Sequence, residues 1–133
     1  MDELDLETAA GQAVAEVMIK RPKTVAANAS VSDARQVFAN PRVQVCPVVD
    51  DDGRVVGELT RESIPSSADD AAPATRFSSG LPDVIAPGDS MADAMRRLEE
   101  LGGERLTVVD AEGHLAGLLC LNRRNGQFCV DPR

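Results

Sequence analysis

The feature that most constrains the fold is an internal duplication with a spacing of sixty residues. Residues 24–60 align without a gap on residues 84–120, and ten of the thirty-seven positions are identical. Average residue usage gives roughly two or three identities by chance over that length. The chain is therefore predicted to be a tandem repeat, and its function is best sought between the two copies.

Both copies end in a pattern that is typical of a β-hairpin. Residues 43–60 and 103–120 each contain two apolar runs separated by a cluster of acidic residues and a glycine, at residues 50–53 and 110–113. Such a cluster between apolar runs marks a hairpin with more than two loop residues. The end of each copy is thus predicted to be two antiparallel strands.

A helix is predicted ahead of each hairpin. Ser30 and Ser90 each stand three residues before an aspartate, and this pattern is typical of a capping box at a helix N-terminus. Apolar residues then recur on one face, and Pro41 and Gly102 end the two helices. With a short strand at residues 24–25, each copy is predicted to read strand, helix, strand, hairpin turn, strand.

The segments outside the copies are predicted from composition and periodicity. Residues 1–7 are expected to form a frayed acidic arm, residues 8–18 an amphipathic helix, and residues 66–79 a linker rich in Ser, Ala and Asp. The runs after Thr60 and Cys120 have room for one helical turn at most. The predicted segments are an N-terminal arm and helix at 1–18, a first unit at 19–64, a linker at 65–82, a second unit at 83–124 and a C-terminal tail at 125–133, where Phe128 is the one large apolar group.

Composition excludes several classes of function. The net charge of −8 argues against a nucleic-acid surface, because phosphate binding depends on Lys and Arg. No apolar run is long enough to span a bilayer, and the acidic N-terminus is unlike a signal peptide, so a cytoplasmic location is predicted. Aromatic residues make up only 2% of the chain, so the core must be aliphatic.

The cysteines and the single histidine indicate neither a metal site nor catalysis. Cys46 and Cys120 fall in predicted strands, where a buried thiol is the simplest interpretation, and only Cys129 is expected to be exposed. His114 has no acidic or cysteine partner at ligand spacing, and the run at residues 50–52 is explained by a solvated hairpin turn. We therefore predict no metal ligand, no catalytic residue and no enzymatic activity.

Short motifs occur in the same order in both copies. In the first copy they are Val17-Met18, Pro22-Lys23-Thr24-Val25, Ser30-Val31-Ser32-Asp33-Ala34, Cys46-Pro47-Val48-Val49-Asp50, Gly53 and Val56-Gly57. In the second copy they are Val84-Ile85-Ala86, Ser90, Asp93-Ala94, Val108-Val109-Asp110, Gly113 and Gly117. By these motifs, residues 14–124 resemble a pair of cystathionine-beta-synthase (CBS) domains, the Bateman module.

The resemblance implies a fold, an assembly and a site. The fold is α+β, with two β-α-β-β units in tandem about a pseudo-twofold axis, and two clefts between them that often bind AMP, ATP or S-adenosylmethionine. Pairs of this kind usually form a homodimer with a regulatory role toward a protein partner. The residues at ligand-binding positions are Thr24, Val25, Pro47 and Thr60 in the first copy and Val84, Ile85, Thr107 and Arg123 in the second.

The chain departs from the family where the ribose is held. The family places an Asp three residues after a Ser or Thr at the end of the last strand. At the Asp position this chain has Ser63 in the first copy, three residues after Thr60, and Arg123 in the second copy, three residues after Cys120. A carboxylate accepts hydrogen bonds from both ribose hydroxyls, but Arg offers only donors and favours an anion such as a phosphate. Two functions stay open: a regulatory sensor of an adenosine-type ligand, or a dimeric interaction scaffold with vestigial clefts.

A homodimer is expected from the helix faces. The family covers apolar faces around Ala34 and Ala94 with a second module, and an uncovered patch of that kind is unusually large for a monomer. The sequence therefore predicts that these two faces are open in a single chain.

Overall fold

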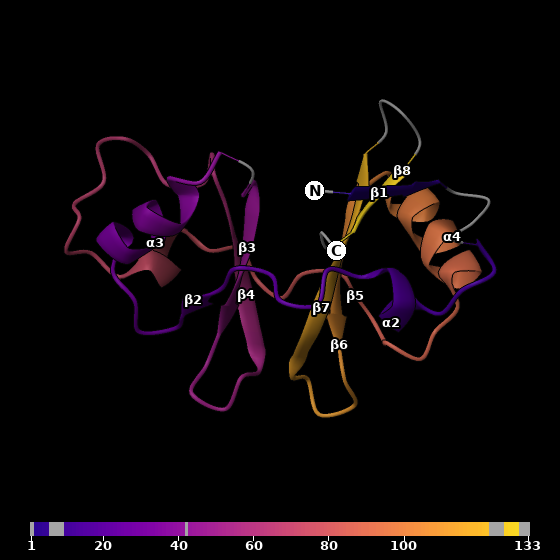
Figure 1. Cartoon of the computed structure of the whole chain (residues 1–133). Helices are drawn as coiled ribbons and strands as arrows, with labels where there is room; N and C mark the ends of the chain where they lie inside the picture. Colours follow the sequence, from indigo (N-terminus) through magenta and orange to yellow (C-terminus); the bar gives the residue numbers. More distant parts are fainter. Residues whose placement is uncertain (1, 6–9, 42, 123–126, 131–133) are drawn as a thin grey trace. The chain divides into compact units, whose positions relative to one another are not determined.

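The computed structural model describes residues 2–5, 10–41, 43–122 and 127–130. By contacts within the chain it divides into two compact units. We name Pro22–Pro82 the first unit, because it holds the first copy, and Met1–Arg21 with Asp83–Arg133 the second unit, because it holds the second copy (Figure 1). Residues 65–82, which were expected to form a linker, lie in the first unit by these contacts.

The first unit is a three-stranded sheet covered on one face by a helix. Its strands are β2 (Val25–Ala26), β3 (Val45–Val49) and β4 (Val55–Thr60), in the order β2-β3-β4. β2 is parallel to β3, and β4 is antiparallel to it. The helix α3 (Val31–Phe38) and a short 3₁₀ helix, η1 (Ala74–Phe77), pack on the sheet (Figure 1).

The second unit repeats this arrangement and extends the sheet. It contains β1 (Asp2–Asp5), α2 (Val14–Val17), β5 (Val84–Ile85), α4 (Met91–Leu101), β6 (Arg105–Val109), β7 (Leu115–Asn122) and β8 (Gln127–Val130). The strand order is β1-β8-β7-β6-β5, with β5 parallel to β6 and the other pairs antiparallel. The α+β fold with two β-α-β-β repeats is thus confirmed.

Local sequence signals account for the helix ends and the hairpins. Ser30 accepts a hydrogen bond from the backbone of Asp33, whose carboxylate accepts one from the Ser30 backbone, so the capping box is complete. Gly102 ends α4 with a left-handed φ of 62°. Gly53 and Gly113 adopt φ values of 85° and 88° in the two hairpin loops, where a side chain would be strained.

Each unit has its own aliphatic core. In the first unit the helix α3 buries Ala34 and Phe38 against Cys46, Val48 and Leu59 of the sheet. The core of the second unit is formed by Val14, Val17, Ile85, Met91, Ala94, Leu98, Leu106, Val108, Leu119 and Phe128. Ala34 and Ala94 are fully buried inside their units, so the prediction that open faces around them drive dimer formation is wrong.

The repeat extends further toward the N-terminus than the sequence identities do. Ile19 forms a bridge with Leu118 and Ser79 forms one with Glu58, and these four positions correspond at the sixty-residue spacing. In the same way α2, which belongs to the second unit, corresponds to η1 of the first. The segment that leads into each copy therefore packs on the sheet of the other copy.

The expectations for the two ends of the chain are wrong. Residues 2–5 of the supposed frayed arm form β1, which pairs with β8 from the supposed tail, because a four-residue strand at the sheet edge gains backbone hydrogen bonds there. The run after Cys120 begins as strand, because β7 continues to Asn122; residues 123–124 of that run lie outside the described residues.

The helix predicted over residues 8–18 is interrupted. Within the described residues of this segment Ala10 is helical and Val14–Val17 form α2, but Ala13 between them is extended and pairs with Ser90. Backbone bonds from Val14 to Asp89 and from Met91 to Gln12 hold this part extended across the start of α4. None of the helices in the described part of the chain has the length and hydrophobicity to span a bilayer.

Candidate functional site

Three of the predicted site residues of the first copy share one face of the sheet. The pairs Val25–Val48 and Cys46–Leu59 contribute side chains to the core of the first unit. Because side chains alternate along a strand, Thr24, Pro47 and Thr60 lie on the opposite face. Pro47 is buried, Thr60 is half-buried and Thr24 is exposed, while the fourth predicted residue, Val25, is buried in the core and offers only its backbone.

The second copy has the same arrangement with different chemistry. Ile85 and Leu106 face the core, which leaves Val84, Thr107 and Cys120 on the other face. Val84 pairs with Thr107, whose side chain is 1% exposed. The fourth predicted residue, Arg123, lies outside the described residues.

One backbone contact distinguishes the two copies at this face. The Thr107 N–H donates to the Asp83 carbonyl at 3.0 Å. Pro47 occupies the equivalent position in the first copy and has no N–H, so the Lys23 carbonyl instead accepts from the Cys46 thiol at 3.2 Å. Burial raises the pKa of Cys46 to about 12, so this thiol stays protonated and can donate.

The residue at the family's ribose-binding position has a local role. The Ser63 hydroxyl donates to the Thr60 carbonyl at 2.8 Å and accepts from the Thr60 N–H at 3.1 Å. These bonds close the turn that follows β4. The Thr60 hydroxyl makes no hydrogen bond with any of the residues that the structure describes, so it is available to a ligand, as is the exposed Thr24 on the same face.

Two arginines of the first unit bind backbone carbonyls. Arg61 donates to the carbonyls of Asn40 and Val43, each at 2.7 Å, and its guanidinium lies 5.6 Å from the centre of the Phe38 ring. This geometry ties the end of β4 to the loop after α3. We therefore assign Arg61 a structural role.

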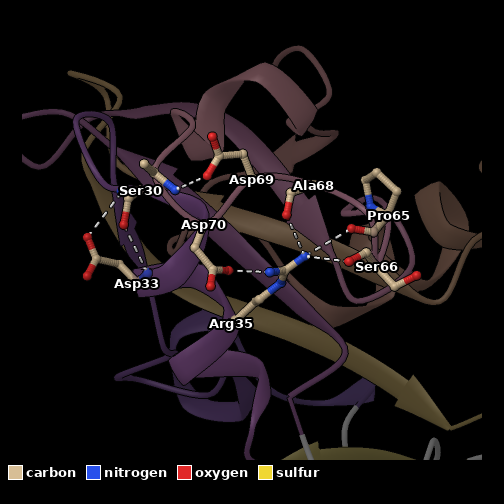
Figure 2. A network of polar contacts seen from close by, with 9 residues as sticks. Ser30, Asp33, Arg35, Pro65, Ser66, Ala68, Asp69 and Asp70 are labelled. Atoms are coloured by element: carbon tan, nitrogen blue, oxygen red, sulfur yellow. Dashed lines mark hydrogen bonds and ion pairs between the residues drawn. The ribbon is translucent and has the colours of Figure 1, made fainter.

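Arg35 organises the segment between the copies. Its guanidinium pairs with the Asp70 carboxylate and donates to the carbonyls of Pro65, Ser66 and Ala68, at 3.1 to 3.3 Å (Figure 2). A single side chain thus anchors a loop that was expected to act as a linker. This contact could not be predicted from the sequence, because an arginine on a helix is most simply interpreted as part of the solvated face.

The hairpin of the second copy brings three possible ligands of a metal together. One ligand atom each of Asp110, Glu112 and His114 lies within 4.8 Å of the others, which the sequence reading of His114 did not anticipate. Asp110, however, closes the turn: it accepts from the His114 N–H at 2.9 Å, and this bond lowers the pKa of its carboxyl group. We assign no metal to this hairpin cluster.

Comparisons with known proteins agree with this geometry. A family model described as "CBS domain" matches residues 14–65. The crystal structure of CBSX2 in complex with AMP, a CBS-pair protein from Arabidopsis thaliana, is 28% identical and covers 83% of this chain and 90% of that chain, with a TM-score of 0.71. The chain is a tandem pair of CBS domains. The alignment spans both copies, as the duplication predicted.

Two further proteins are similar to this chain, one in fold and one in sequence. The CBS domain pair of protein MJ0100, solved in complex with 5′-methylthioadenosine and S-adenosyl-L-methionine, has a TM-score of 0.69 at 18% identity and covers 82% of this chain and 89% of that chain. The inosine-5′-monophosphate dehydrogenase of Rhodopirellula baltica is 29% identical over an alignment of 122 residues that covers 87% of this chain. This CBS pair spans only 23% of that enzyme's length.

Proposed function

We propose that this CBS pair is a non-catalytic regulatory module whose first copy binds an adenosine-type ligand. The observation that supports it is the shared sheet face of Thr24, Pro47 and Thr60, with the Thr60 hydroxyl unbonded to described residues. The half-buried Thr60 and the exposed Thr24 each carry a hydroxyl that offers a donor to a ribose or phosphate oxygen. The AMP complex of CBSX2 supports the same ligand class.

The first copy is a better candidate than the second. At the end of the last strand the first copy has Thr60, whereas the second has Cys120, and a thiol is a weak hydrogen-bond donor. An anionic ligand held by Arg123 is the form that a second-copy site would take, since a guanidinium binds phosphate oxygens well. AMP, ATP and S-adenosylmethionine are therefore the ligands to test.

Differential scanning fluorimetry with these three ligands tests the proposal. A ligand that binds only the folded state raises the melting temperature with its concentration, and at a hundred times its Kd it adds about 2.7 kcal/mol of stability. We expect saturable stabilisation by at least one of the three. Thr60→Val, which removes only the hydroxyl, is expected to weaken that binding, and Thr75→Val, at a half-buried threonine of η1 on the core side of the same sheet, is the matched control.

Ser63→Asp provides a gain-of-function test. A carboxylate at this position can still accept from the Thr60 N–H, and it adds acceptors for ribose hydroxyls at the position where the family has them. We expect Ser63→Asp to bind AMP more tightly than the unaltered protein. A variant that folds normally and binds no better would contradict a ligand in the family's orientation.

A dimeric interaction scaffold is the second candidate function. The observation that favours it is the Ser63 hydroxyl, which is used within its own turn and replaces the carboxylate expected there. Under this function no nucleotide would shift the melting temperature, while light scattering would still show a homodimer. A monomeric mass at micromolar concentration would contradict the dimer, and its protein partner has to be found by experiment.

A further inference from the structure

Two cysteines lie opposite each other on neighbouring antiparallel strands of the second unit. β7 and β8 pair Leu121 with Phe128 and Asn122 with Gln127. One further step along the same register brings Cys120 opposite Cys129. Leu121 and Phe128 both pack in the core, so the alternation of side chains places both cysteines on the other face of the sheet.

Two further residues extend this row across the sheet, Arg105 of β6 beside Cys120 and Glu3 of β1 beside Cys129. On its other side Cys120 pairs with Arg105 of β6, so that Arg105, Cys120 and Cys129 follow one another on three adjacent strands. A hydrogen bond with Cys129 lowers the pKa of the Cys120 thiol to about 7, and the positive charge of Arg105 acts in the same direction, against the effects of burial and of Glu104. A substantial fraction of Cys120 is therefore thiolate near neutral pH, and the thiolate is the reactive form.

The strand geometry suits a bond between the two sulfurs. Residues that face each other in an antiparallel pair have Cα atoms about 4.5 to 5.5 Å apart. Disulfides span Cα separations of about 4.4 to 6.8 Å and need Cβ atoms about 3.5 to 4.5 Å apart, which is about 1 Å closer than a typical facing pair. A small approach of the two strands is enough.

We propose that Cys120 and Cys129 form a reversible cross-strand disulfide when the chain meets a low-molecular-weight disulfide. The Cys120 thiolate attacks one sulfur of the oxidant, which gives a mixed disulfide and releases one thiol. The Cys129 thiolate, having lost its proton to solvent, then attacks the Cys120 sulfur and releases the second thiol. Both cysteines are oxidised by one electron each, and the oxidant is reduced to two thiols.

The disulfide ties the added strand β8 to the repeat. Cys120 occupies the position of Thr60 in the first copy, so the bond forms at the strand end where the two copies diverge. Cys46 provides an internal reference: it is fully buried, and burial raises its pKa to about 12, so it stays a thiol under the same conditions.

The test is a titration of the reduced full-length chain with glutathione and oxidised glutathione, followed by alkylation in denaturant and trypsin digestion. Cleavage at Arg105, Arg123 and Arg124 places the two cysteines on separate peptides, residues 106–123 and 125–133. We expect these peptides to become disulfide-linked while the Cys46 peptide remains alkylated. Persistence of both thiols at every ratio would overturn the proposal, as would glutathione retained on Cys120 without closure.

Two further comparisons test whether the strand register favours the disulfide, beyond the short distance in sequence between the two cysteines. In urea, where the strands are not paired, we expect the equilibrium constant for closing the bond to be lower by about tenfold or more. An equal constant in the folded and unfolded chain would overturn the proposal. Cys129→Ser is expected to accumulate the mixed disulfide on Cys120, whereas Cys46→Ser is expected to form the linked peptides as the unaltered chain does.

Discussion

The two units share a backbone plan but differ after the last strand of the repeat. Both hairpins have an irregularity of register at the same place, between Val48 and Val49 and between Val108 and Val109. The first unit then ends in the turn that Ser63 closes, whereas β7 runs on to Asn122 and pairs with β8. The core of the repeat is thus retained in both copies, and the chain has diverged at the edge of the sheet.

A second difference concerns the same position on the two helices. Arg35 of α3 corresponds to Met95 of α4 at the sixty-residue spacing. Arg35 reaches out to the carbonyls of residues 65–68, whereas Met95 packs against the core of its own unit. The first unit therefore secures a polar loop at a position where the second unit adds apolar contact.

The largest effect is expected from Phe128→Ala. Phe128 is fully buried in the core of the second unit, and it lies on the strand that the first unit lacks. Truncation of a buried aromatic side chain costs about 3 to 5 kcal/mol of the free energy of unfolding. Urea denaturation measures the total loss, and hydrogen exchange shows whether protection is lost mainly in β7 and β8.

The exposed side chain of Leu81 provides the control for that experiment. It is 74% exposed, so Leu81→Ala is expected to change the free energy of unfolding by less than about 0.5 kcal/mol. If Phe128→Ala were as mild as Leu81→Ala, the added strand would not belong to the core, and the contrast between the units would be lost.

The next-largest loss of stability is expected at two glycines that lie against the segments leading into each copy, around Ile19 and Ser79. A Cβ atom on Gly117 would lie 2.6 Å from the Ile19 carbonyl oxygen and 2.6 Å from the Met18 sulfur, and one on Gly57 would lie 2.8 Å from the Ser79 carbonyl oxygen. We expect Gly117→Ala and Gly57→Ala to destabilise the protein by about 1 to 3 kcal/mol each, because the backbone that crosses them must move. The tighter contacts at Gly117 predict the larger loss.

Thermal and urea denaturation of both variants measure the two losses of stability and so test which is larger. Gly103→Ala is the control. A Cβ atom on Gly103 would have no neighbour within 4 Å, so only a small change is expected there. Equal, small effects at all three glycines would mean that the leading segments do not lie on the sheets as described.

The sequence was sufficient to predict the parts of the fold that depend on local patterns. The constant spacing, the serine caps and the acidic hairpin turns each have a physical cause within a few residues, and all three appear in the structure. The sequence analysis missed that the segment leading into each copy packs on the sheet of the other copy, because this packing depends on backbone pairing between residues far apart in the chain, such as Ile19 with Leu118 and Ser79 with Glu58. The one sequence sign of it is the identity of Pro22 and Pro82 at the repeat spacing.

The candidate site was predictable in position but not in detail. Alternation along the strands was enough to place Pro47, Thr60 and Thr107 on the face away from the core. The role of Ser63 depends on a turn geometry that no composition signal carries, and the facing of Cys120 and Cys129 depends on a strand that four residues form. Such short strands are recognised only once their partner is known.

The smallest effect is expected at the helix N-termini, where the two units differ by one hydrogen bond. Ser30 and Asp33 bond reciprocally, whereas the cap of α4 shows one bond, from the Asp93 N–H to Ser90 at 3.1 Å. Replacing a capping serine costs about 1 kcal/mol, and we expect Ser30→Ala and Ser90→Ala to cost about the same, because Asp33 accepts from the backbone N–H of residue 30, which alanine keeps. Chemical denaturation of both variants beside Ser32→Ala, which lies two residues further along α3, measures the two losses; a clear difference between Ser30→Ala and Ser90→Ala would show that the two helices do not begin in the way the repeat implies.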